Sequence, residues 1–132
     1  PADPLFRSSY LSTEPTKVGY TFRGWSTSQN QTSGTYTSGQ IAINPATNTI
    51  ESKTIEEQTE QVMKNLVSIL EAAGAKPKNT VKTLCFLTDI NDFAAFNKVY
   101  ERYFTEKPAR SCVGIHAPPK GAICEVEVIA AL

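Results

Sequence analysis

Residues 54–87 read TIEEQTEQVMKNLVSILEAAGAKPKNTVKTLCFL, and this stretch decides how the rest of the chain can fold. Thr54 and Glu57 form the capping-box pattern that begins a helix. Apolar residues then recur at helical spacing as far as Ala73, and Gly74 follows, where it is suited to a C-terminal cap. These signals predict a helix over residues 55–73. The largely apolar run 81–87 predicts a strand inside a sheet.

A strand precedes this stretch and a second helix follows it. Residues 35–43 are rich in β-forming side chains, so strand, helix and strand together predict a parallel pair with a right-handed crossover. Asn91 or Asp92 is suited to cap the second helix. We expect that helix to end near Phe104, because Pro108 cannot continue it.

Two more strands are predicted at the C-terminus, over residues 109–115 and 122–132, with residues 116–121 joining them as a hairpin. These elements make an α+β fold in which two helices pack on one face of a mixed sheet. The chain offers no third helix for the other face. We therefore expect sister chains to cover that face.

Composition limits the class of protein. The 132 residues suit a single domain, with residues 1–34 as a variable N-terminal segment. Thirteen basic residues balance thirteen acidic ones, which argues against nucleic-acid binding because that function usually needs a basic excess. No apolar run approaches the roughly 20 residues of a membrane span. The three cysteines include no CxxC pair, so we expect no zinc site. Reduced thiols suit a cytoplasmic protein, or a mitochondrial one if a presequence was removed before Pro1.

Polar residues inside the predicted C-terminal strands are candidates for chemistry. Strand periodicity places Arg110 and Cys112 on one face of their strand, and Glu125 and Glu127 on one face of the next. If the hairpin closes symmetrically, Cys112 lies opposite Glu125. Arg110 then lies diagonal to Glu125, within reach of a long side chain.

Such parts suit hydrolysis of a small molecule that bears a carboxylate. A guanidinium can clamp a carboxylate with two parallel hydrogen bonds, and a nearby carboxylate can orient a water. Ser38 and Gly39 interrupt the first strand, where a glycine lets a backbone N–H approach an anion. On pattern alone, however, an Arg and a Glu on adjacent strands are more often a structural salt bridge. Cys112 is more often a packed side chain than a nucleophile, and the lone His116 lies in a loop.

Three segments carry a family resemblance: Pro108-Ala109-Arg110-Ser111-Cys112-Val113, Cys124-Glu125-Val126-Glu127-Val128 and Leu87-Thr88-Asp89-Ile90-Asn91-Asp92-Phe93. With further matches across residues 35–132, the family core, they resemble the RidA (YjgF/YER057c/UK114) family. The resemblance implies a chorismate-mutase-like fold and a homotrimer with sites between subunits. It also implies deamination of 2-iminobutanoate and 2-iminopropanoate, which pyridoxal-phosphate enzymes such as threonine dehydratase release, with no cofactor and no metal.

The resemblance implies roles for four of the candidate residues. Arg110 matches the carboxylate-binding arginine of the family, and Glu125 matches the acid that positions the attacking water. Cys112 matches a residue that lines the pocket through its backbone. Asn97 matches a polar pocket residue on the second helix.

The N-terminal part of the site resembles the family less well. Ser38 and Gly39 match the loop that closes over the ligand. The family usually carries an Ile-Gly-Pro-Tyr-like motif whose aromatic residue reaches a neighbouring subunit's site. The nearest match here is Tyr20, but the proline is missing and the stretch from Tyr20 to Ser38 is several residues longer than usual.

Two other functions stay open at this point. The chain could keep the fold and the cleft as a ligand-binding or regulatory module. It could also cleave RNA and inhibit translation, an activity long attached to the family. The presence of both Arg110 and Glu125 favours the enzyme over the module, and zero net charge disfavours the RNA activity.

Overall fold

The computed structural model describes the backbone of residues 35–131 and the side chains of residues 39–131. The strands and α-helices of this part are β1 (Thr35–Ile41), α2 (Ile55–Ala72), β2 (Thr80–Leu87), α3 (Phe93–Tyr103), β3 (Ala109–Gly114) and β4 (Cys124–Ala131). Short 3-10 helices are found at η1 (Pro77–Asn79), η2 (Ile90–Asp92) and η3 (Pro119–Gly121). Tyr20 lies outside the described residues.

Helix α2 begins and ends close to where the sequence predicts. The Glu57 backbone N–H donates to Thr54 Oγ1 at 3.3 Å, which satisfies one of the unpaired donors at the helix start. Just after the helix, Gly74 takes a φ of +81°, a left-handed conformation that glycine adopts without strain. The cap and the glycine together fix both ends of α2.

Removing the Thr54 side-chain cap should weaken the fold measurably. We expect Thr54→Ala to lower the free energy of unfolding by about 1 kcal/mol, because a donor in the first turn of α2 loses its partner. Urea denaturation measures this difference. Thr105→Ala, at an exposed position after α3, is the matched control. A loss no larger than that of the control would contradict the capping role.

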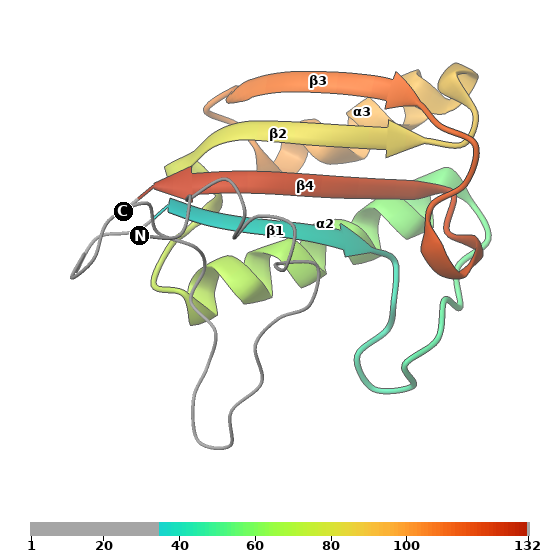
Figure 1. Cartoon of the computed structure of the whole chain (residues 1–132), viewed down its shortest axis with the longest axis horizontal. Helices are drawn as coiled ribbons and strands as arrows, with labels where there is room; N and C mark the ends of the chain where they lie inside the picture. The colour runs from blue at the N-terminus through green and yellow to red at the C-terminus, as the bar shows by residue number, and fades with distance from the viewer. Residues whose placement is uncertain (1–34, 132) are drawn as a thin grey trace, which may run out of the picture.

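The four described strands form one sheet in the order β1-β4-β2-β3. β4 is antiparallel to both of its neighbours, whereas β2 and β3 are parallel. Both α2 and α3 lie behind this sheet in Figure 1, on the same face. The predicted α+β fold, with two helices on one face of a mixed sheet, is therefore confirmed. No helix of the described residues is long and apolar enough to cross a membrane.

Two predicted strand pairings are wrong. β1 and β2 run in the same direction, but β4 lies between them, so they do not pair. β3 and β4 do not form a hairpin, because β2 separates them. In its central position β4 has a hydrogen-bonded neighbour on each side, and its helix-facing residues Cys124, Val126, Val128 and Ala130 are at most 1% exposed. This burial favours the central position over a local hairpin.

Two buried polar side chains attach α2 to the sheet and the loops beside it. Asn65 Nδ2 donates to the carbonyl oxygens of Ile41 and Ile43, at 3.1 and 2.8 Å. Gln58 Oε1 accepts from the Ile123 backbone N–H at 3.0 Å. Because both amides are paired, their burial carries little desolvation penalty and fixes the position of the helix.

The sheet face opposite the helices, called the open face below, is defined by Leu84, Phe86, Glu125, Glu127 and Ile129. All five side chains are half-buried, and they alternate with the residues that face the helices. The face therefore combines apolar side chains with two carboxylates.

Candidate functional site

Arg110 lies on the helix side of the sheet. It is the second residue of β3, an edge strand among the described residues, and its Cα partner on β2 is the buried Thr83. Paired residues of neighbouring strands point to the same face, so Arg110 points toward α3. Its side chain is half-buried there.

Residues of α3 at positions i, i+4 and i+7 hold the Arg110 guanidinium. Its Nη1 donates to Asn97 Oδ1 at 2.7 Å. Its central carbon lies 4.6 Å from the centre of the Tyr100 ring and 5.3 Å from that of Phe93, distances at which a cation is attracted to an aromatic face. No carboxylate of the described residues forms an ion pair with it. The remaining N–H groups can therefore bind an anion from outside.

Cys112 lies two residues further along β3, on the same face as Arg110. Its Cα partner on β2 is Cys85, which is fully buried. Burial raises the pKa of the Cys112 thiol, although the nearby Arg110 charge opposes the rise. Burial also raises the pKa of Cys85 to about 12. Both side chains are therefore neutral thiols at neutral pH, which suits packing rather than nucleophilic attack.

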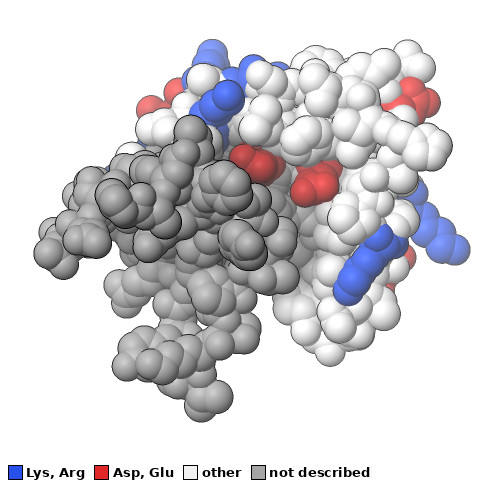
Figure 2. Space-filling view, in the orientation of Figure 1, with Lys and Arg blue, Asp and Glu red and all other residues white. Residues whose placement is uncertain are grey.

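Glu125 lies on the open face, where its Cα partners are Phe86 on β2 and Ile41 on β1. A Cβ placed on Gly39 would meet Glu125 Oε1 at 3.2 Å, so the glycine leaves room for this carboxylate. Burial, and then the charge of Glu127, raises the pKa of the Glu125 carboxyl. Figure 2 looks onto this face and shows acidic side chains amid uncharged ones.

The raised pKa of Glu125 predicts a pH-dependent gain in stability when the carboxyl is removed. Ionisation of Glu125 weakens the fold as pH rises through the raised pKa, whereas below the ordinary value of 4.5 the carboxyl is protonated in both states. We therefore expect Glu125→Gln to raise the free energy of unfolding at neutral pH and to change it little at about pH 4. Urea denaturation at both pH values measures this, with the exposed Glu106→Gln as control. An equal effect at both pH values would contradict the prediction.

The predicted meeting of Arg110 and Glu125 within one chain is wrong. The predicted faces are right, since Arg110 shares a face with Cys112 and Glu125 shares one with Glu127. However, β2 lies between β3 and β4 in the sheet. Arg110 points to the helix side of the sheet, whereas Glu125 points to the open face. From strand spacing and register, their Cα atoms lie roughly 14 Å apart. One chain therefore cannot place both groups on one small substrate.

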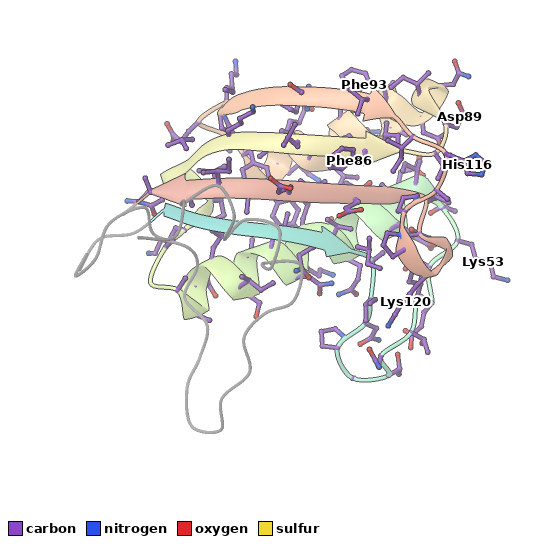
Figure 3. The ribbon with its side chains drawn as sticks, viewed as in Figure 1. Lys53, Phe86, Asp89, Phe93, His116 and Lys120 are labelled. Carbon is purple, nitrogen blue, oxygen red and sulfur yellow. The ribbon has the colours of Figure 1, made fainter. Side chains whose placement is uncertain are left out.

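The remaining candidates divide between the two faces. Gly39 lies beside Glu125, and Asn97 contacts Arg110. Ser38 lies in β1, where its Cα partner is Val128 of β4. Tyr20 is outside the described residues. The exposed His116 lies in the loop after β3, at one end of the sheet (Figure 3).

Sequence reasoning missed the aromatic support beneath Arg110. In the sequence, Phe93 and Tyr100 follow the apolar spacing of a helix, which by itself indicates packing and not a role at a site. Figure 3 shows Phe93 at the β3 edge of the sheet, whereas Phe86 lies on the middle strands. The signal was present in the spacing, because Phe93, Asn97 and Tyr100 share one face of a helix.

The described residues also contain a hollow of about 450 Å³ between α2 and α3, which holds none of the candidates. Its lining includes Glu60, which forms ion pairs with Arg102 at 2.7 Å and Lys64 at 3.7 Å. The Arg102 pair connects α3 to α2, whereas the Lys64 pair lies within α2, and exposed pairs of this kind contribute little stability. No group of three or more His, Cys, Asp or Glu side chains in the described part could hold a metal ion.

Comparison with known proteins gives a consistent match. The family model described as Endoribonuclease L-PSP matches residues 20–132. A proposed regulator, AldR, from Lactococcus lactis is 48% identical over 72% of this chain and 76% of its own length. The 2-iminobutanoate/2-iminopropanoate deaminase of Salmonella typhimurium is 44% identical over 71% of this chain and 76% of its own length. Among solved structures, the crystal structure of E. coli TdcF with bound serine matches with a TM-score of 0.71 and 33% sequence identity. The match covers 89% of this chain and 92% of the TdcF chain.

Proposed function

Because the chain belongs to the endoribonuclease L-PSP family, also known as the YjgF/RidA family, we propose that it hydrolyses reactive 2-imino acids to 2-keto acids and ammonia. The proposed substrates are 2-iminobutanoate and 2-iminopropanoate. The observation that carries the proposal is the Arg110 guanidinium, which Asn97 and Tyr100 orient while its other donors stay available to a carboxylate. The Salmonella relative bears the name of this activity, and the E. coli relative binds serine, a small 2-amino acid.

Arg110 binds the substrate in this proposal. Two N–H groups of the guanidinium donate to the two oxygens of the imino acid carboxylate, which fixes the position of the adjacent C=N carbon. Asn97 occupies one nitrogen and the aromatic rings lie against the planar group, so little freedom is lost on binding. Imine hydrolysis is fairly easy in water, and positioning therefore supplies most of the acceleration.

Glu125 supplies the water. Its carboxylate accepts a hydrogen bond from a water and takes up a proton as the oxygen attacks the C=N carbon, which forms a carbinolamine. With the imine nitrogen protonated at the start, Glu125 returns its proton to the amino group and then takes the hydroxyl proton as the C–N bond breaks and the C=O bond forms. Ammonia leaves and takes up this last proton, and the 2-keto acid remains. Burial of Glu125 within its own chain raises the pKa of its carboxyl, and the Arg110 guanidinium of the neighbouring copy opposes that rise in the two-chain site.

The site requires two chains. Since Arg110 and Glu125 lie on opposite faces of one sheet, Glu125 must come from a second copy whose open face packs near the β3 edge of the first. Such a contact joins two different surfaces and can repeat around a closed ring, and the homotrimer that we propose then contains three equivalent sites. The half-buried apolar side chains of the open face, Leu84, Phe86 and Ile129, support this packing.

A ligand-binding regulator is the second candidate. The Lactococcus lactis relative, a proposed regulator, favours it, and the same Arg110 clamp would serve to bind a carboxylate without turnover. RNA cleavage is disfavoured, because the two carboxylates of the open face would repel phosphates.

A coupled assay tests the proposal. Threonine dehydratase releases the imine from threonine, and semicarbazide traps the free imine as a semicarbazone. The chain should suppress semicarbazone formation and speed the appearance of 2-oxobutanoate. Binding of 2-oxobutanoate without any such effect would favour the regulator. RNA degradation that survives repurification and Arg110→Ala would favour the ribonuclease.

A further inference from the structure

A single buried hydrogen bond anchors the ring beneath Arg110. The Tyr100 hydroxyl lies 2.7 Å from Thr83 Oγ1, and the two residues are 4% and 0% exposed. Thr83 is also the Cα partner of Arg110 across the β2–β3 ladder. The bond therefore joins α3 to the sheet at Thr83, the residue that is paired with Arg110.

This bond constrains the guanidinium through the ring. Tyr100 packs between Phe96 and Phe104, with ring centres 5.8 and 4.7 Å away, but these residues belong to α3 and its C-terminal cap, so the ring contacts do not attach the helix to the sheet. The hydrogen bond at the tip of the Tyr100 ring does attach it, and its geometry is directional. Asn97, one turn earlier on the same helix face, is held with it.

We propose that Thr83 and Tyr100 are positioning residues that fix the plane of the Arg110 guanidinium for carboxylate binding. Neither residue touches the substrate, because both lie beneath the guanidinium. The expected effect on KM rests on the proposed function, whereas the expected displacement of the guanidinium does not. The pair sets affinity for the carboxylate, so its loss should raise KM and Kd while kcat changes little.

A double replacement separates positioning from stability. Thr83→Val with Tyr100→Phe removes both hydroxyls at nearly constant shape and leaves no buried polar group without a partner, so the fold should keep most of its stability. A purely structural pair would then leave binding intact. A positioning pair would let the guanidinium move although the protein stays folded.

Three measurements on the intact protein test the inference. We expect the Kd for 2-oxobutanoate, measured by calorimetry, to rise roughly tenfold in the double variant, within the effect of one net hydrogen bond. KM should rise by a similar factor in the coupled assay. A ligand-free crystal structure of the variant should show the guanidinium displaced from Asn97 Oδ1. Tyr103→Phe, which removes another α3 hydroxyl that donates to Glu60, is the matched control and should leave all three unchanged.

Thr83→Ser keeps the hydroxyl and loses only a methyl group. It should retain the Kd of the unaltered chain, whereas Thr83→Val should not. Equal losses in these two variants, or a double variant with unchanged Kd and an intact Arg110–Asn97 bond, would overturn the inference. If the unaltered chain neither binds 2-oxobutanoate nor hydrolyses imines, the proposed function fails, and the position of the guanidinium in the variant structure still decides this inference.

Discussion

Replacing Arg110 by Ala should abolish suppression of semicarbazone formation and lower kcat/KM by at least about a hundredfold. The expected loss is large because two charge-assisted hydrogen bonds to the substrate carboxylate disappear together. The fold should survive, since Arg110 is half-buried on an edge strand and forms no ion pair with the described carboxylates. Circular dichroism and mass in solution check that the variant is intact.

Arg110→Lys is the informative companion. It keeps the charge but loses the planar fork, so it should restore only part of the binding. Exposed Arg102→Ala, which removes an arginine from the same side of the sheet without touching the site, is the control. A kcat/KM for Arg110→Ala equal to that of the unaltered chain would remove the proposed clamp.

Replacing Leu84 by Asp should convert the assembly to single chains and remove activity almost completely. Leu84 lies on the open face of the central strand β2, half-buried beside its Cα partner Glu127. If sister chains cover this face, an aspartate there buries a charge next to another carboxylate, which costs several kcal/mol. Sedimentation at micromolar concentration measures the mass, and the coupled assay measures the activity.

Leu84→Met conserves volume and apolar character, so it should keep both the assembly and the activity. An active Leu84→Asp variant that sediments as a single chain would contradict the two-chain site. A Leu84→Asp variant that keeps the oligomer mass would place the interface elsewhere on the molecule.

Local elements could be predicted from the sequence because their signals are local. The capping pattern at Thr54, the helical spacing that follows and the glycine at 74 determine α2 within one or two residues. Strand periodicity correctly placed Arg110 with Cys112, and Glu125 with Glu127. These are properties of a few consecutive residues, so no distant part of the chain is needed to explain them.

The order of the strands could not be predicted in this way. A short connection from β3 to β4 favours a hairpin, but the alternation of small apolar residues in β4 suits a buried central strand that packs against α2. Choosing between these requires comparison of whole-sheet packing, a non-local energy. The error then carried over to the site, because a hairpin would have brought Arg110 and Glu125 together on neighbouring strands of one chain.

Mixing two inactive variants tests the two-chain site most directly. Arg110→Ala and Glu125→Gln chains, each expected to be inactive alone, are unfolded together and refolded at equal amounts. If each site takes Arg110 from one chain and Glu125 from the next, random mixing should restore activity at about one quarter of the sites. If both groups act from the same chain, every site lacks one of them, and a mixture as inactive as its components would contradict the proposed site.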